Sequence, residues 1–143
     1  MIQAVFLDVG GVFHLPTEER MREALRGAGF ELPPNVLARA HYAGMAGHDR
    51  LDGEYVEMME PYVEEFVREL AVPKERVAAA EASLLTALTT AGAWAGQLWE
   101  SIEQLPALAA TGARIAIVSN ADGTVEARLR AEGVCQVGPG PGV

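Results

Sequence analysis

The sequence predicts an α/β protein in which a parallel sheet is interrupted by a long helical insertion. Two short runs, residues 2–7 and 114–120, are typical of buried parallel strands because they carry apolar side chains, some of them β-branched or aromatic, and glycines or small polar residues end them. The segment between these runs carries helical patterns and no strand-like character. A strand, a helical pattern and a second strand together indicate right-handed crossovers in one sheet.

Four helices are expected between the two strands. The first begins at residues 16–20, where proline and threonine precede two acids, and the second opens at residues 33–35. The third, within residues 51–70, carries a broad apolar stripe but contains Pro61, which we expect to split or kink it. The fourth, residues 73–88, is rich in alanine and leucine.

Helical patterns also flank the second strand. Residues 102–110 end at a Thr-Gly pair suited to a C-cap, and residues 122–132 show helical spacing of apolar side chains. We therefore divide the chain into residues 1–15, the first part of the α/β core, residues 16–92, the helical insertion, and residues 93–143, the second part of the core.

Composition excludes several classes of partner. The chain has 143 residues and a formal net charge of −9, with eleven basic residues against twenty acids, which argues against nucleic acid and anionic membranes. Cys135 is the only cysteine, so no intramolecular disulfide forms and a reducing compartment fits. No apolar run approaches the ~20 residues that span a bilayer. We expect a cytoplasmic protein with no membrane partner.

Polar residues follow both predicted strands. Asp8 and Ser119 each come directly after an apolar run, and ligands bind beyond the carboxyl ends of parallel strands. Gly10 and Gly11 permit a tight turn whose N–H groups suit an anion, and the helix expected after Asn120 presents further N–H groups. A carboxylate repels a phosphate unless a cation such as Mg²⁺ bridges them or the carboxylate is the attacking group.

These patterns resemble a known family. The run Val5-Phe6-Leu7-Asp8-Val9-Gly10-Gly11-Val12 resembles the first motif of the haloacid dehalogenase superfamily, and Ile-Val-Ser-Asn, ending at Asn120, resembles its second motif. The helical insertion after the first motif resembles the superfamily's helical cap, so the resemblance covers essentially the whole chain. It implies a Rossmann-like parallel sheet core, incomplete in these 143 residues, with an inserted helical bundle.

The resemblance also implies an activity, that of a Mg²⁺-dependent phosphatase of a small phosphorylated metabolite. Asp8 would be the nucleophile that forms a covalent aspartyl ester, and Ser119 would hold a phosphoryl oxygen with Asn120 beside it. Asp8 and the backbone carbonyl of Gly10 would bind Mg²⁺. Gly11 lies in the same candidate phosphate-binding turn. His14, just past the glycines, is a candidate substrate contact, with a partly buried loop histidine as the alternative.

Two departures from the family pattern qualify this prediction. Most phosphatases of the superfamily carry a second Asp where this chain has Gly10, and that residue protonates the leaving group. The 23 residues after Asn120 contain no Lys and only one Asp, Asp122, whereas family members place a Lys and further acids there. The single Lys of the chain is Lys74. We therefore expect an N-terminal portion of a longer protein, with weak Mg²⁺ binding and little turnover on its own.

Other functions stay open at this point. A 2-haloacid dehalogenase would also lack the second Asp and would use a cleft Arg, for which Arg39 and Arg50 are candidates. A phospho-acceptor signalling domain is disfavoured because Asp8 lies too early in the chain. A non-catalytic interaction protein would keep the fold and lose the chemistry. It would use the helical lobe for dimerisation. For the chain in general, a homodimer or pairing through the exposed edge of the sheet stays open.

Overall fold

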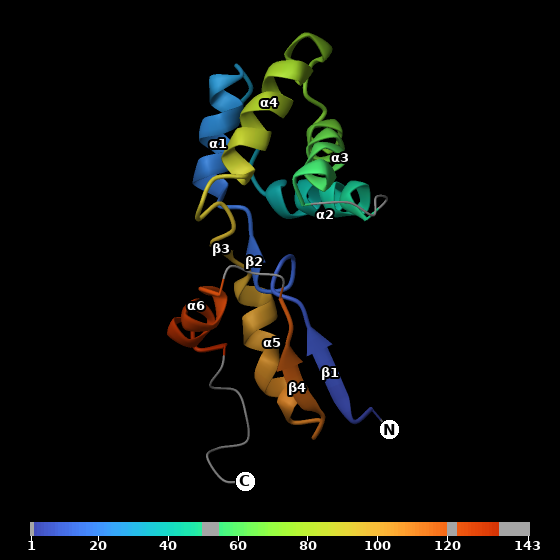
Figure 1. Cartoon of the computed structure of the whole chain (residues 1–143), viewed down its shortest axis with the longest axis vertical. Helices are drawn as coiled ribbons and strands as arrows, with labels where there is room; N and C mark the ends of the chain where they lie inside the picture. Colours follow the sequence, from blue (N-terminus) through green and yellow to red (C-terminus); the bar gives the residue numbers. More distant parts are fainter. Residues whose placement is uncertain (1, 50–54, 120–122, 135–143) are drawn as a thin grey trace. The chain divides into compact units, whose positions relative to one another are not determined.

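The computed structural model of the chain (Figure 1) describes residues 2–49, 55–119 and 123–134, and it is an α/β protein. The chain divides into two compact units. One comprises Met1–His14 with Gln97–Val143, and the other comprises Leu15–Gly96. The boundaries suggested by the sequence, at residues 15 and 92, stay a prediction.

Two parallel strands form the sheet of the first unit. Strand β1 (Ala4–Leu7) pairs with β4 (Arg114–Ile117), with Ala4 opposite Arg114 and Leu7 opposite Ile117. The Val118 N–H donates to the Leu7 carbonyl at 2.9 Å, so the pairing continues past the last paired residues. In both strands, exposed and partly buried side chains alternate, which shows that the described residues cover one face of the sheet and not both.

Helices cover the inner face of this sheet. Helix α5 (Trp99–Ala109) lies along the two strands in Figure 1, and α6 (Val125–Ala131) contributes to the same core. The buried core residues come from both helices and from the segments after β1 and α6: they are Val9, Phe13, Leu105, Leu129 and Val134. The inner-facing side chains Leu7 and Ile117 pack against them.

A second, very short sheet occurs where the chain passes from one unit to the other. It pairs β2 (His14–Leu15) with β3 (Gly96–Gln97). Gly96 is required there, because a Cβ atom would lie 2.8 Å from the carbonyl oxygen of Pro16. Within the helical unit, the Thr17 N–H and hydroxyl donate to the Ala93 carbonyl at 2.7 and 3.1 Å. These bonds hold the two ends of the helical unit together.

The second unit is helical. It contains α1 (Glu18–Gly27), α2 (Leu37–His48), α3 (Tyr55–Glu69), the short 3₁₀ helix η1 (Lys74–Arg76) and α4 (Val77–Leu88). Helix α2 packs against α3, and α4 packs against both α1 and α3 (Figure 1). The four helices predicted from the sequence are therefore present, and their apolar stripes form one continuous core.

Helix α3 continues through Pro61, so of the two expected effects, a split or a kink, the split does not occur. A proline inside a helix costs about 3 kcal/mol, but the residues that follow it, including Tyr62 and Phe66, are fully buried and offset that cost. Glycines on α2 permit the close packing: a Cβ at Gly47 would lie 2.4 Å from the Pro61 carbonyl oxygen, and one at Gly44 would lie 2.7 Å from the Tyr62 ring.

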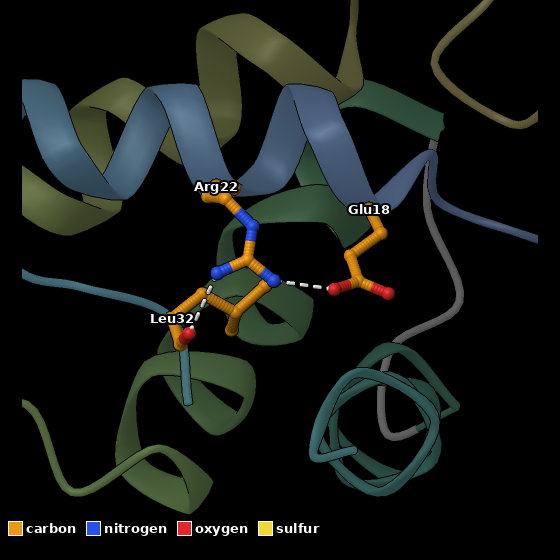
Figure 2. Close-up of polar contacts among 3 residues, drawn as sticks. All are labelled: Glu18, Arg22 and Leu32. Atoms are coloured by element: carbon orange, nitrogen blue, oxygen red, sulfur yellow. Dashed lines mark hydrogen bonds and ion pairs between the residues drawn. The ribbon is translucent and has the colours of Figure 1, made fainter. Parts of the chain in front are cut away.

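One arginine ties α1 to the connection that precedes α2. Figure 2 shows the Arg22 guanidinium donating through one nitrogen to Glu18, one helical turn earlier, and through the other to the Leu32 carbonyl at 3.0 Å. Leu32 itself is buried in the helical core. The contact therefore gives a hydrogen-bond donor to a backbone carbonyl outside regular secondary structure. Without that donor, burial of the carbonyl would cost free energy.

A buried histidine lies in the core of the helical unit. The His41 ring is 5.2 Å from the Tyr42 ring, 5.9 Å from the Tyr62 ring and 5.8 Å from the Trp94 ring. Its Nδ1 is hydrogen-bonded to the Tyr62 hydroxyl at 2.9 Å, and its Nε2 has no hydrogen-bond partner among the described residues. Burial lowers the pKa of His41 from 6.5 to about 4.

None of the helices within the described ranges is long and apolar enough to cross a lipid bilayer.

The lowered pKa of His41 predicts acid sensitivity of the helical unit. Below pH 6.5 His41 binds a proton in the unfolded chain, whereas in the folded unit the His41 side chain stays neutral down to about pH 4. The free energy of unfolding is therefore expected to be about 2 kcal/mol lower at pH 5 than at pH 7. Urea denaturation at both pH values measures the difference, and His41→Asn should reduce it; an unchanged difference in that variant would contradict the assignment.

Candidate functional site

The pairing of β1 with β4 places two of the predicted site residues at the same edge of the sheet. Asp8 and Ser119 lie one and two residues beyond the last paired residues, Leu7 and Ile117. Because the strands are parallel, this edge is the carboxyl end of both. Both side chains are exposed.

The polar atoms of these two side chains make few hydrogen bonds with the described residues. The Asp8 Oδ1 accepts a hydrogen bond from the Val9 N–H at 2.6 Å. Among the described residues, Asp8 forms no ion pair and its Oδ2 has no hydrogen-bond donor, and the Ser119 hydroxyl makes no hydrogen bond. One carboxylate oxygen and one hydroxyl are therefore available at this edge.

The turn after Asp8 is held firmly. The Val9 carbonyl accepts hydrogen bonds from the N–H groups of Val12, Phe13 and His14, at 3.2, 2.9 and 3.0 Å. The side chains of Val9 and Phe13 are buried in the core of the first unit. These anchors fix the backbone on either side of the glycines, so the position of Asp8 is set by packing as well as by the strand.

The two glycines of this turn have different roles. Gly11 has φ +73°, a conformation that favours glycine, and its N–H donates to the His14 carbonyl at 2.8 Å. That N–H belongs to the turn, which corrects the expectation that it is free for an anion. Gly10 has no left-handed φ, and a Cβ there would meet no atom within 4 Å. The Gly10 carbonyl accepts no hydrogen bond from the described residues.

His14, a predicted substrate contact, is a buried side chain with a protein partner. It is 2 % exposed, and its Nε2 is 2.8 Å from Oε2 of Glu132, the residue that ends α6. The pair joins the turn after β1 to the end of α6. The geometry assigns the His14 side chain a structural contact. This side chain is fully buried in β2, whereas the alternative that the sequence left open was a partly buried loop histidine. Glu132 was not found from the sequence, because 118 positions separate it from His14.

The segment after Ser119 differs from expectation at the start of its helix. Helix α6 begins at Val125 and not at residue 122, because Gly123 adopts φ +82°, which a helix does not accommodate. The helix is seven residues long, and its N–H groups do not follow Ser119 directly. Asn120, predicted to lie beside the phosphate, is outside the described residues, as is Asp122.

Two further sets of predicted ligands can be placed. Within the described part of the chain, no group of three or more His, Cys, Asp or Glu side chains could hold a metal ion. The Mg²⁺ ligands that the sequence predicts remain the Asp8 carboxylate and the Gly10 carbonyl. Of the two arginines considered for a dehalogenase, Arg39 pairs with Glu69 at 2.5 Å, and Arg50 is outside the described residues.

No protein-family model matches this chain, and no curated protein matches it.

The contact between His14 and Glu132 leads to a stability prediction. Glu132→Ala removes the partner of a buried ring nitrogen, so we expect the free energy of unfolding to fall by about 1–3 kcal/mol. Glu126→Ala is the matched control: it removes an exposed acid of the same helix, paired with Arg130, and should cost at most about 0.5 kcal/mol. Urea denaturation compares the two variants, and equal losses would show that the His14 contact contributes little.

Proposed function

We propose that the chain is a hydrolase of the haloacid dehalogenase superfamily and acts as a Mg²⁺-dependent phosphatase on a small phosphorylated metabolite. In this proposal β1, β4, α5 and α6 belong to a Rossmann-like core, and residues 15–96 form its helical cap. The observation that supports it is the placement of Asp8 and Ser119, both without a side-chain partner among the described residues, at the carboxyl ends of two adjacent parallel strands.

The proposed reaction has two steps. The free Oδ2 of Asp8 attacks the phosphorus of a phosphate monoester, a new O–P bond forms, and the bond from phosphorus to the leaving oxygen breaks. The leaving alkoxide takes a proton from water. A water molecule then attacks the phosphorus of the aspartyl phosphate, which releases inorganic phosphate and restores the carboxylate.

The neighbouring groups support this chemistry. The Ser119 hydroxyl is an available donor at the same edge and would bind a phosphoryl oxygen. The Asp8 carboxylate and the Gly10 carbonyl are two oxygen donors of the kind that Mg²⁺ prefers, and they would hold the ion. When bound, Mg²⁺ supplies positive charge that offsets the repulsion between carboxylate and phosphate.

Gly10 restricts the substrates that react well. A glycine has no group to protonate the leaving oxygen, and general acid catalysis is worth about 10²–10⁴ in rate. Substrates whose leaving group is a stable anion need this assistance least. We therefore propose that acyl phosphates, aryl phosphates and sugar-1-phosphates are hydrolysed faster than simple alkyl phosphates.

Covalent labelling tests the nucleophile directly. The full chain, incubated with acetyl phosphate and Mg²⁺ and quenched in acid, should gain one phosphoryl group that hydroxylamine removes, measured by intact mass. Asp8→Asn should abolish the label. Asp49→Asn is the matched control, because it makes the same change at an exposed carboxylate that follows α2. Labelling that persists in Asp8→Asn, or no labelling of the unaltered chain, would refute the proposal.

The space around Gly10 permits a gain-of-function variant. Gly10→Asp introduces a carboxyl group where no atom lies within 4 Å of the new Cβ and where the backbone is not left-handed. We expect it to accelerate hydrolysis of alkyl phosphates by about 10²–10⁴ and to change aryl phosphate hydrolysis far less. Rates on p-nitrophenyl phosphate and an alkyl phosphate measure this ratio; an equal change on both substrates would argue against the role of position 10.

A further inference from the structure

The outer face of the sheet in the first unit is apolar and exposed. Ile2 just before β1, Phe6 on β1 and Val118 just after β4 are 74 %, 72 % and 55 % exposed. The small side chains of Ala4 and Ala116 between them are exposed as well. Three of the five large hydrophobic side chains exposed in the described ranges therefore belong to these two strands and their ends.

This arrangement is unusual for a parallel sheet. Strands in parallel sheets are normally covered on both faces, whereas among the described residues the core of α5 and α6 packs on the Leu7 and Ile117 side only. The register places Phe6 directly beside Ala116, so the exposed apolar side chains are contiguous and not scattered. Contiguous exposed apolar surface marks an interaction site.

Opposite charges stand at the two ends of this face. Arg114, beside Ala4, lies two residues before Ala116, and Asp8 lies two residues after Phe6. Both side chains are exposed, and neither forms an ion pair with another residue in the described part of the chain. The face thus runs from a positive end, over an apolar centre at Phe6, to a negative end.

We propose that this face binds the same face of a second copy of the chain. A two-fold axis between the sheets, perpendicular to the strands and passing near Phe6, turns one copy so that the strands of the two copies run antiparallel. The two Phe6 rings then meet at the centre. Arg114 of each copy lies at the same end as Asp8 of the other. Packed sheets are about 10 Å apart, a gap that an arginine and an aspartate side chain bridge together.

Self-complementarity identifies the occupant as a second copy. When a face with opposite charges at equal distances from an apolar centre is rotated by 180°, its positive end meets the negative end of the other copy. This self-complementarity is the requirement for an isologous interface. A few apolar side chains fall short of the roughly 800 Å² per partner of a standard interface, so the dimer is a weak one. This inference does not depend on the proposed phosphatase activity.

Sedimentation equilibrium over a range of chain concentrations tests the apolar centre. The unaltered chain should pass from monomer to dimer with increasing concentration, and Phe6→Lys should stay monomeric at every concentration. Trp99→Lys is the matched control, because Trp99 is a similarly exposed aromatic residue on α5 and should leave dimerisation unchanged. Circular dichroism checks that each variant is folded. A chain that remains monomeric, or a dimer that Phe6→Lys leaves intact, would overturn the proposal.

A pair of charge variants tests the orientation. In Arg114→Glu, and separately in Asp8→Lys, both cross-copy pairs become repulsive, so each variant alone should be monomeric. A mixture of the two should form a heterodimer, because every cross-copy pair is then attractive. If the mixture does not associate, this geometry is excluded, and the remaining alternative is that the face binds another protein. The measurements contain neither phosphate nor Mg²⁺. Asp8 labelling is carried out on dilute chain, where the weak dimer is dissociated and Asp8 is not engaged across the interface, so the two tests are decided separately.

Discussion

The parallel pairing of β1 with β4 is the constraint on which the other features of the first unit depend. It joins segments that are far apart in the sequence, and its register, with Leu7 opposite Ile117, determines which side chains share a face. A shift of one residue in β4 would turn Ile115 and Ile117 outward and bring Ala116 and Val118 into the core. The position of Ser119 relative to Asp8 would change with it. Core packing and the candidate site are thus specified by the same backbone hydrogen bonds.

The elements with strong periodicity were predictable from sequence. Both strands and all six α-helices lie within or near the expected ranges, because apolar runs and helical stripes extend over enough residues to be recognised. The two-residue strands β2 and β3 carry no such pattern and were not expected. The late start of α6 depends on the backbone angle of Gly123, and the continuity of α3 through Pro61 depends on tertiary packing. Neither can be derived from local propensity.

The candidate site was predictable to a similar extent. Asp8 and Ser119 could be assigned to one edge because the rule about strand ends requires only that each strand be recognised. The use of the Gly11 N–H within the turn, and the burial of His14 against Glu132, follow from three-dimensional contacts that no sequence spacing encodes. Local chemistry was thus visible in the sequence, while the partners of each group were not.

The bonds from Thr17 to Ala93 have a kinetic consequence for how the chain reaches this state. In the unfolded chain, β1 and β4 must meet across roughly 100 intervening residues, and once the helical unit has formed, its joined ends shorten that loop to roughly 30. The entropic free-energy cost of closing the loop then falls by about 1 kcal/mol, so the two strands meet several times more often. Contacts between consecutive helices, such as α2 with α3 and α3 with α4, are local in sequence and form quickly, which favours formation of the insertion before the strands pair.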